Sequence, residues 1–217
     1  MGFEYIDVYI AQFSVLIPLV LGILKKNYLT KPYRWILWSV ALSTLMEIGT
    51  KTMAYYGPNY FLFHLDTLAQ GITLIPFFYF SFQSQKVRKW LKASLILLFL
   101  VELFEIILIT GIYQYNSITR SYLSVLMTVL SFQYLRNIGR NEVLVDVHKH
   151  PMFWFCLAIL LYFFANVLTF ISGNWLSQTS IGQFLLAHRI HLVILILMRI
   201  LLAVGFWRIP KTRHLWS

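Results

Sequence analysis

The chain alternates between long apolar segments and short polar connections. Seven apolar segments occur, each of roughly 18 to 26 residues, and a helix rising about 1.5 Å per residue crosses the hydrocarbon core of a bilayer with that length. They are Tyr5–Leu24, Tyr33–Tyr55, Tyr60–Phe82, Val87–Ile112, Ile118–Leu135, Met152–Ile171 and Gln183–Trp207. Because the connections are short, each helix should run antiparallel to its neighbour in sequence. The pattern predicts an all-α, polytopic membrane protein, a single seven-transmembrane-helix up-and-down bundle over residues 1–217.

The composition supports this interpretation. Hydrophobic residues make up 59% of the 217 residues and charged residues only 12%, with a mean hydropathy of +0.70. Soluble domains carry about twice this charged fraction. The formal net charge of +10 would suit a nucleic-acid-binding protein, but nearly all lysines and arginines lie in the connections between apolar segments. We therefore expect a lipid bilayer around the bundle and no nucleic-acid partner.

The basic residues also predict the orientation of the bundle. Fourteen of the eighteen lysines and arginines follow the first, third, fifth or seventh segment. They are Lys25, Lys26, Lys31, Arg34, Lys86, Arg88, Lys89, Lys92, Arg136, Arg140, Lys149, Arg208, Lys211 and Arg213. The other side has Glu4 and Asp7 and few basic residues. Since cytoplasmic connections are enriched in lysine and arginine, we expect the N-terminus outside the cytoplasm and the C-terminus inside.

Strongly polar residues also occur inside the apolar segments, and this orientation puts most of them in the outer half of the bundle. They are Glu47, Lys51, His64, Asp66, Glu102, Glu105, Arg120, Asn166, His188 and His191, with Arg199 deeper in the seventh segment. A charge at the centre of a bilayer costs several kcal/mol, so such residues face the bundle interior and often mark a functional site. We expect these residues to form a polar ligand-binding pocket in the outer half.

Helical spacing indicates which of these residues share a face. His188 and His191 are three residues apart, and Arg199 follows His188 by eleven residues, close to three turns. All three should therefore lie on nearly the same helix face. Glu47 and Lys51 are one turn apart and can pair along their helix.

Two carboxylates in the fourth segment are harder to accommodate. Glu102 and Glu105 lie three residues apart on one face, deep in the segment. They need a cation, a proton or a histidine partner. Arg120, by contrast, opens the fifth segment and could simply extend towards the outer head groups.

A metal site is an alternative use of some of these residues. His64, Asp66, His188 and His191 have side chains that can ligate zinc, as a membrane hydrolase would require. However, the spacings HxD and HxxH are not a specific zinc motif. Seven-span hydrolases of the ceramidase and progestin-receptor-like group would carry serine and histidine on the second segment and HxxxH on the seventh, but this chain has LSTLMEIGTKTM and HRIH. No retinal is expected, because the seventh segment has no lysine for a Schiff base, and zinc is expected only if the protein is such a hydrolase; the sequence leaves the cofactor unknown.

The longest connection on the predicted inner side, residues 136–150, contains the only two acidic residues on that side, Glu142 and Asp146. It has two interpretations. It is either a solvated linker between helices or a docking surface for a cytoplasmic signalling partner.

The sixth and seventh segments, HPMFWFCLAILLYFFANVLTFI and HRIHLVILILMRILLAVGFWR, resemble those of seven-helix membrane proteins of Bacteroidetes-type bacteria. Those proteins in turn resemble the seven-transmembrane input modules of bacterial sensor histidine kinases. The resemblance implies a sensory role in a bacterial inner membrane beside a separate kinase, since no phosphoacceptor helix or ATP-binding domain is found in this sequence. It assigns no functional residues. We expect a receptor-like or sensory module, with a metal-dependent hydrolase and a non-catalytic accessory subunit as alternatives.

Overall fold

The computed structural model of the chain describes residues 6–57, 59–109, 111–141, 146–179 and 181–211. They form the helices α1 (Ile6–Phe13), α2 (Leu16–Leu24), α3 (Lys31–Ala54), α4 (Tyr60–Ser81), α5 (Gln85–Leu108), α6 (Ser117–Asn141), α7 (Pro151–Thr179) and α8 (Ile181–Trp207). Short 3-10 turns lie at Lys26–Tyr28 and Val147–Lys149. No strand lies within the described ranges, so the prediction of an all-α protein is confirmed for them.

The helix bounds follow the predicted segments closely. The first segment is divided into α1 and α2, and each later segment corresponds to one helix. The largest differences are at the C-terminal ends of α6 and α7, which continue six and eight residues past the predicted Leu135 and Ile171. Both extensions are polar (RNIGRN and SGNWLSQT), because a helix can continue into residues that are too polar to be counted in an apolar segment.

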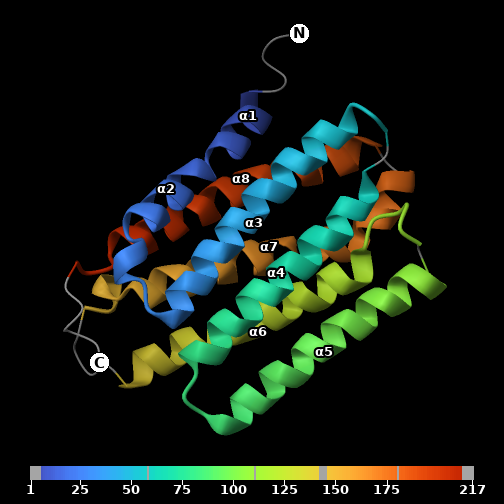
Figure 1. Ribbon diagram of the computed structural model, residues 1–217. Coiled ribbons are helices and arrows are strands. Elements are labelled where there is room, and N and C mark those ends of the chain that lie inside the picture. Colours follow the sequence, from blue (N-terminus) through green and yellow to red (C-terminus); the bar gives the residue numbers. More distant parts are fainter. Residues whose placement is uncertain (1–5, 58, 110, 142–145, 180, 212–217) are drawn as a thin grey trace.

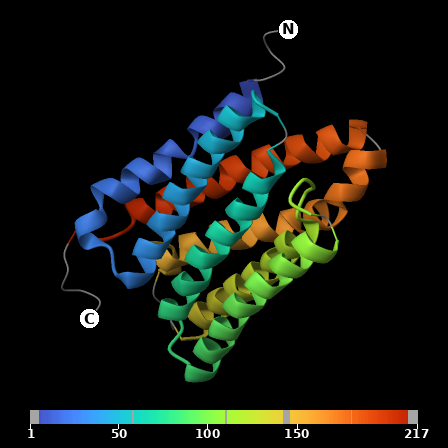
Figure 2. The same cartoon turned by 45° about the vertical axis from the view of Figure 1, so that its right-hand side comes forward.

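Helices α1 and α2 run in the same direction, and each later helix runs antiparallel to the one before it, so α1 begins at one end of the bundle and α8 ends at the other (Figures 1 and 2). Helix α8 packs against α1, α2 and α7; α7 packs against α6, α6 against α4, α4 against α3, and α3 against α2. These contacts close a ring of helices. Helix α5 is outside the ring, where it packs on α4 and α6 at the edge of the molecule (Figure 1).

The two ends of the bundle differ in charge. We call the end where α2, α4, α6 and α8 finish the basic end, because the lysines and arginines of the connections gather there. Lys25 joins two helices at this end by donating a hydrogen bond of 2.6 Å to the carbonyl of Ile209. Burial, followed by the charge of Lys211, lowers the pKa of the Lys25 ammonium. The C-terminal ends of α2 and α8 are therefore held together at the basic end.

The outside of the bundle is rich in large apolar side chains. On α5 alone, the exposed residues include Ile96, Leu97, Phe99, Leu100, Leu103, Phe104, Ile107 and Leu108. Continuous apolar surface of this kind is typical of contact with a membrane or a partner protein. Two stretches of the described helices, Tyr60–Ser81 and Arg189–Trp207, have the length and apolar composition required of a membrane span. This supports a membrane protein, and the number of spans stays a prediction.

Candidate functional site

A cavity of about 330 Å³ lies inside the helix ring. Its walls come from the helices of the ring and not from α5. Ligand pockets in proteins typically have about 300 to 1,000 Å³, so the cavity has the size of a small-molecule site. Six of the predicted site residues line it: Glu47, Lys51, Asp66, Arg120, His191 and Arg199.

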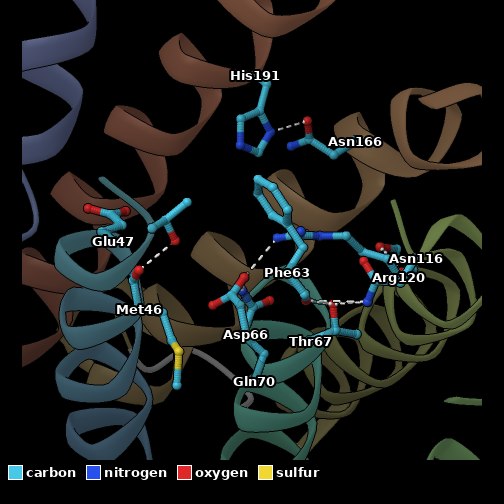
Figure 3. Close-up of polar contacts among 12 residues, drawn as sticks. Met46, Glu47, Phe63, Asp66, Thr67, Gln70, Asn116, Arg120, Asn166 and His191 are labelled. Carbon is cyan, nitrogen blue, oxygen red and sulfur yellow. Dashed lines mark hydrogen bonds and ion pairs between the residues drawn. The ribbon is translucent and has the colours of Figure 1, made fainter. Parts of the chain in front are cut away.

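Asp66 of α4 and Arg120 of α6 form an ion pair at the cavity wall. Arg120 Nη2 donates to Asp66 Oδ2 at 2.9 Å, and the amide of Gln70 donates to the same oxygen at 2.8 Å (Figure 3). The guanidinium also lies over the rings of Phe63 and Tyr115, 5.9 and 5.7 Å from their centroids. Arg120 is buried, so it does not extend to the head groups as the sequence allowed. Its charge is balanced inside the protein.

A second ion pair joins α8 to α3 deeper in the cavity. Arg199 Nη2 donates to Glu47 Oε1, and Nη1 donates to the carbonyl of Ala11 and to Ser14 Oγ at 3.2 Å. Arg199 is buried. It therefore holds together three helical segments that are far apart in sequence.

The carbonyl of Ala11 is available because the first helical segment is broken there. Pro18 has no N–H, and in a continuous helix its ring would clash with the carbonyl of Ser14, four residues earlier. Ser14 lies between the end of α1 and the start of α2. The N–H of Val15 turns to the carbonyl of Gln12 at 3.4 Å instead of the carbonyl of Ala11. The Ser14 hydroxyl, at 2.5 Å, and Arg199 Nη1 donate to the Ala11 carbonyl in place of this N–H.

Lys51 lies in the last turn of α3 and is exposed. The predicted pairing of Lys51 with Glu47 is wrong, because Glu47 reaches across to Arg199. The Lys51 ammonium instead lies over the ring of Tyr9, 5.8 Å from its centroid. No carboxylate among the described residues forms an ion pair with it.

His191 is fixed at the cavity wall by α7. Its Nδ1 lies 2.7 Å from Asn166 Oδ1, while the amide nitrogen of Asn166 donates to the carbonyl of Tyr162 at 2.8 Å (Figure 3). The rings of Tyr162 and His191 are 5.6 Å apart. Since the amide nitrogen is a donor, the amide oxygen accepts and His191 Nδ1 donates. The side chain of His188 lies outside the described part of the structure.

The remaining predicted residues form a closed cluster between α4, α5 and α6. His64 Nδ1 lies 2.6 Å from Glu102 Oε1, and His64 Nε2 lies 3.1 Å from the carbonyl of Gln114. Each ring nitrogen of His64 therefore faces an oxygen atom of a neighbouring part of the chain. His64 and Glu102 are buried. Glu102 thus has the histidine partner that its position required.

Glu105 binds the N-terminus of α6. Its carboxylate accepts from the N–H of Ile118 at 3.0 Å, and from the N–H and hydroxyl of Thr119 at 2.7 and 2.8 Å. The first N–H groups of a helix have no intrahelical partner and carry partial positive charge. Next to this contact, Asn116 donates to Thr67 Oγ1 at 2.8 Å. Glu102 and Glu105 therefore hold the peripheral α5 against its neighbours.

The proposed metal ligands contact different partners. His64 and Asp66 are two residues apart on α4, about 200° around a helix, so one faces α5 and the other faces α6 and the cavity. His191 contacts Asn166. Within the described residues, no three histidine, cysteine, aspartate or glutamate side chains come close enough to hold a metal ion.

The sequence analysis missed several partners of the predicted residues. Tyr162 lines the cavity, and Asn116 and Thr119 complete the contacts at the start of α6. The letters NSIT before an apolar run are a helix-start signal that could have located the latter two. Nothing in the sequence could have singled out Tyr162 among so many aromatic residues.

No protein-family model, curated protein or solved structure matches this chain. The interpretation of the cavity therefore depends on its own geometry. The resemblance to seven-helix input modules stays a prediction.

Proposed function

We propose that the protein is a receptor-like or sensory module of a bacterial inner membrane, a seven-span bundle with its basic end in the cytoplasm, that binds a small molecule in the ring cavity. The observation that carries this proposal is the cavity itself, with charged or polar side chains from α3, α4, α6, α7 and α8 facing one space of about 330 Å³ (Figure 3). A ligand there would touch helices from both halves of the chain.

The position of Arg199 supports a sensory role. It lines the cavity and also holds the break between α1 and α2 through the carbonyl of Ala11. A ligand that fills the cavity lies beside Arg199 and Glu47, the two side chains whose contacts hold this break closed. Ligands shift a conformational equilibrium only through different affinities for its two states, and a shared arginine provides such a difference.

The signal would leave through a separate partner at the basic end. The connection at residues 136–150 is our candidate for the docking surface; residues 142–145 are outside the described structure. In the described part, Lys149 and Asp146 form an exposed ion pair of 2.5 Å. The hydrogen bond and charge of Lys149 lower the pKa of the Asp146 carboxyl. This surface is charged and open to solvent, as docking requires.

Ligand binding is tested by thermal stability of the purified protein in lipid nanodiscs against a panel of small molecules. A ligand of the folded state raises Tm in a concentration-dependent way. Ser43→Phe places a ring into the cavity, because Ser43 lines it. Ala93→Phe is the matched control on the exposed side of α5. Binding that survives Ser43→Phe, or no stabilising molecule in the panel, contradicts the proposal.

The orientation is tested separately with single cysteines and a membrane-impermeant maleimide on intact cells. The native Cys156 is buried and should not react. Tyr56→Cys and Tyr113→Cys are exposed positions in connections at the end opposite the basic end, and Gln83→Cys lies at the basic end. We expect labelling of the first two in intact cells and of Gln83→Cys only after permeabilisation. The reverse pattern, or labelling of all three, contradicts the seven-span orientation.

A further inference from the structure

We propose that the cavity binds a single-chain amphiphile with an anionic head, a carboxylate or a phosphate ester, with the head beside Lys51 and the hydrocarbon chain pointing towards the basic end. This inference rests on the proposed function, because it assigns a ligand class to the same cavity. Three properties of the cavity lead to it: a gradient of polarity, an elongated shape and an excess of positive charge.

The polarity of the lining changes along the bundle axis. At the end opposite the basic end, the polar residues of the lining gather beside Phe63 and Leu192: Thr50, Lys51, Asp66, Gln70, Arg120 and His191. Towards the basic end the lining residues become mainly apolar, with Ser39 among Pro18, Ile36, Val40, Leu74, Ile159 and Leu202. A ligand that matches both regions has one polar end and one apolar end.

The cavity is also elongated. On α8, the lining residues extend from His191 to Leu202, eleven residues, which corresponds to roughly 16 Å at about 1.5 Å per residue. On α3, they extend from Ile36 to Lys51, roughly 22 Å by the same rise. A volume of about 330 Å³ spread over such a length is narrow. One extended hydrocarbon chain fits this shape better than a compact ring system.

The charges of the lining favour an anionic head. Three cationic side chains, Lys51, Arg120 and Arg199, face two carboxylates, Glu47 and Asp66. Each carboxylate is already bound by an arginine.

The remaining cation is Lys51, at the polar end of the cavity. The described residues give its ammonium only the ring of Tyr9 as a contact. A carboxylate or phosphate placed beside Lys51 gains a charge-assisted hydrogen bond without breaking either ion pair. A cationic head would find each carboxylate already paired with an arginine and would be repelled by the ammonium of Lys51.

The test measures Tm of the full chain in phosphatidylcholine nanodiscs with five probes of matched concentration. Dodecanoate and dodecyl phosphate carry the proposed chemistry and distinguish a fatty carboxylate from a phosphate ester. Dodecyltrimethylammonium reverses the charge, dodecanol removes it, and acetate removes the chain. We expect a saturable rise of Tm with at least one of the first two and none with acetate.

Two substitutions locate the head group. Lys51→Met should weaken the apparent Kd of the anionic probe by about tenfold or more, the loss expected for one hydrogen bond to a charged group. Lys92→Met removes an exposed cation at the basic end and should leave the Kd unchanged. Equal effects of both substitutions would mean that charge attracts the probe to the surface only, which overturns the inference.

Failure of this inference can be distinguished from failure of the proposed function. If dodecanol or dodecyltrimethylammonium binds as tightly as dodecanoate, the anionic head is wrong. If no amphiphile binds but a water-soluble molecule does, and Ser43→Phe abolishes its binding, the ligand class is wrong and the receptor-like cavity stands. If no probe or panel molecule shows binding that depends on Ser43, both proposals fail.

Discussion

Glu105 of α5 caps α6 through Thr119, whose N–H and hydroxyl both donate to Glu105 Oε2 at 2.7 and 2.8 Å. A helix is normally capped by a side chain of its own N-cap residue. Here the cap comes from another helix, one that lies outside the ring and exposes a wide apolar surface. The contact therefore joins the start of α6 to the only described helix that the cavity does not touch.

Replacing this cap should destabilise the protein. Glu105→Ala leaves the N–H groups of Ile118 and Thr119 without their acceptor, at an expected cost of about 2–4 kcal/mol in the free energy of unfolding. Glu105→Gln keeps one acceptor oxygen and should cost less than half as much. Ile107→Ala, on the exposed side of α5, is the control and should change stability by about 0.5 kcal/mol or less. Unfolding in a denaturing detergent measures all three; equal effects of Ala and Gln would contradict the cap.

His64 and Glu102 should behave as one unit. Removing one partner leaves a buried polar or charged group unpaired, which typically costs about 3–5 kcal/mol. We expect His64→Leu and Glu102→Leu each to be strongly destabilising. The double variant should be more stable than either single variant, because it leaves neither member of the pair buried without its partner. Additive losses in a double-mutant cycle would show that the two side chains do not interact.

The helices were predictable from the sequence, and the partners of the polar residues were not. The length and hydropathy of a segment locate a helix, because every helix of the bundle presents a long apolar surface either to its neighbours or to the outside. Spacing along one helix then suggests local pairs such as Glu47 with Lys51. In the structure, Glu47 instead binds Arg199, 152 residues away, because helix order and rotation decide which distant groups meet. For the same reason, His64 and Asp66 appeared to belong together in the sequence but face different neighbours.

Two glycines, Gly205 and Gly139, have different surroundings: the first is closely packed and the second has open space beside it. A Cβ on Gly205 of α8 would lie 2.6 to 3.0 Å from three ring atoms of the buried Phe155, so Gly205→Ala should cost about 1–3 kcal/mol. Gly139 of α6 has nothing within 4 Å of its Cβ position, so Gly139→Ala should stabilise by up to about 1 kcal/mol through helix propensity. Thermal unfolding of both variants checks the pair. A neutral Gly205→Ala would mean that α7 and α8 approach less closely than described.

The role of Arg199 at the break between α1 and α2 can be tested by a second substitution that restores stability to Arg199→Ala. Arg199→Ala removes one of the two side-chain donors to the Ala11 carbonyl and the partner of Glu47, and should cost about 2–4 kcal/mol. Pro18→Ala restores an N–H and removes the clash with the Ser14 carbonyl, so the first segment can become one continuous helix. The N–H of Val15 then replaces Arg199 at the Ala11 carbonyl.

We therefore expect Pro18→Ala to recover about 0.5–1.5 kcal/mol when it is added to Arg199→Ala, the value of one backbone hydrogen bond. The Ser14 hydroxyl already donates to the Ala11 carbonyl, so in the presence of Arg199 the N–H of Val15 competes with Arg199 for the second lone pair, and Pro18→Ala should bring little or no gain. Pro76→Ala is the matched control, because α4 continues through Pro76 without a break. Unfolding is measured for Arg199→Ala, for Pro18→Ala, and for Arg199→Ala combined with either Pro18→Ala or Pro76→Ala. If Pro18→Ala restores stability to Arg199→Ala and Pro76→Ala does not, Arg199 closes this break. Equal rescue by both prolines would assign the effect to general helix propensity and remove the structural link between the cavity and α1.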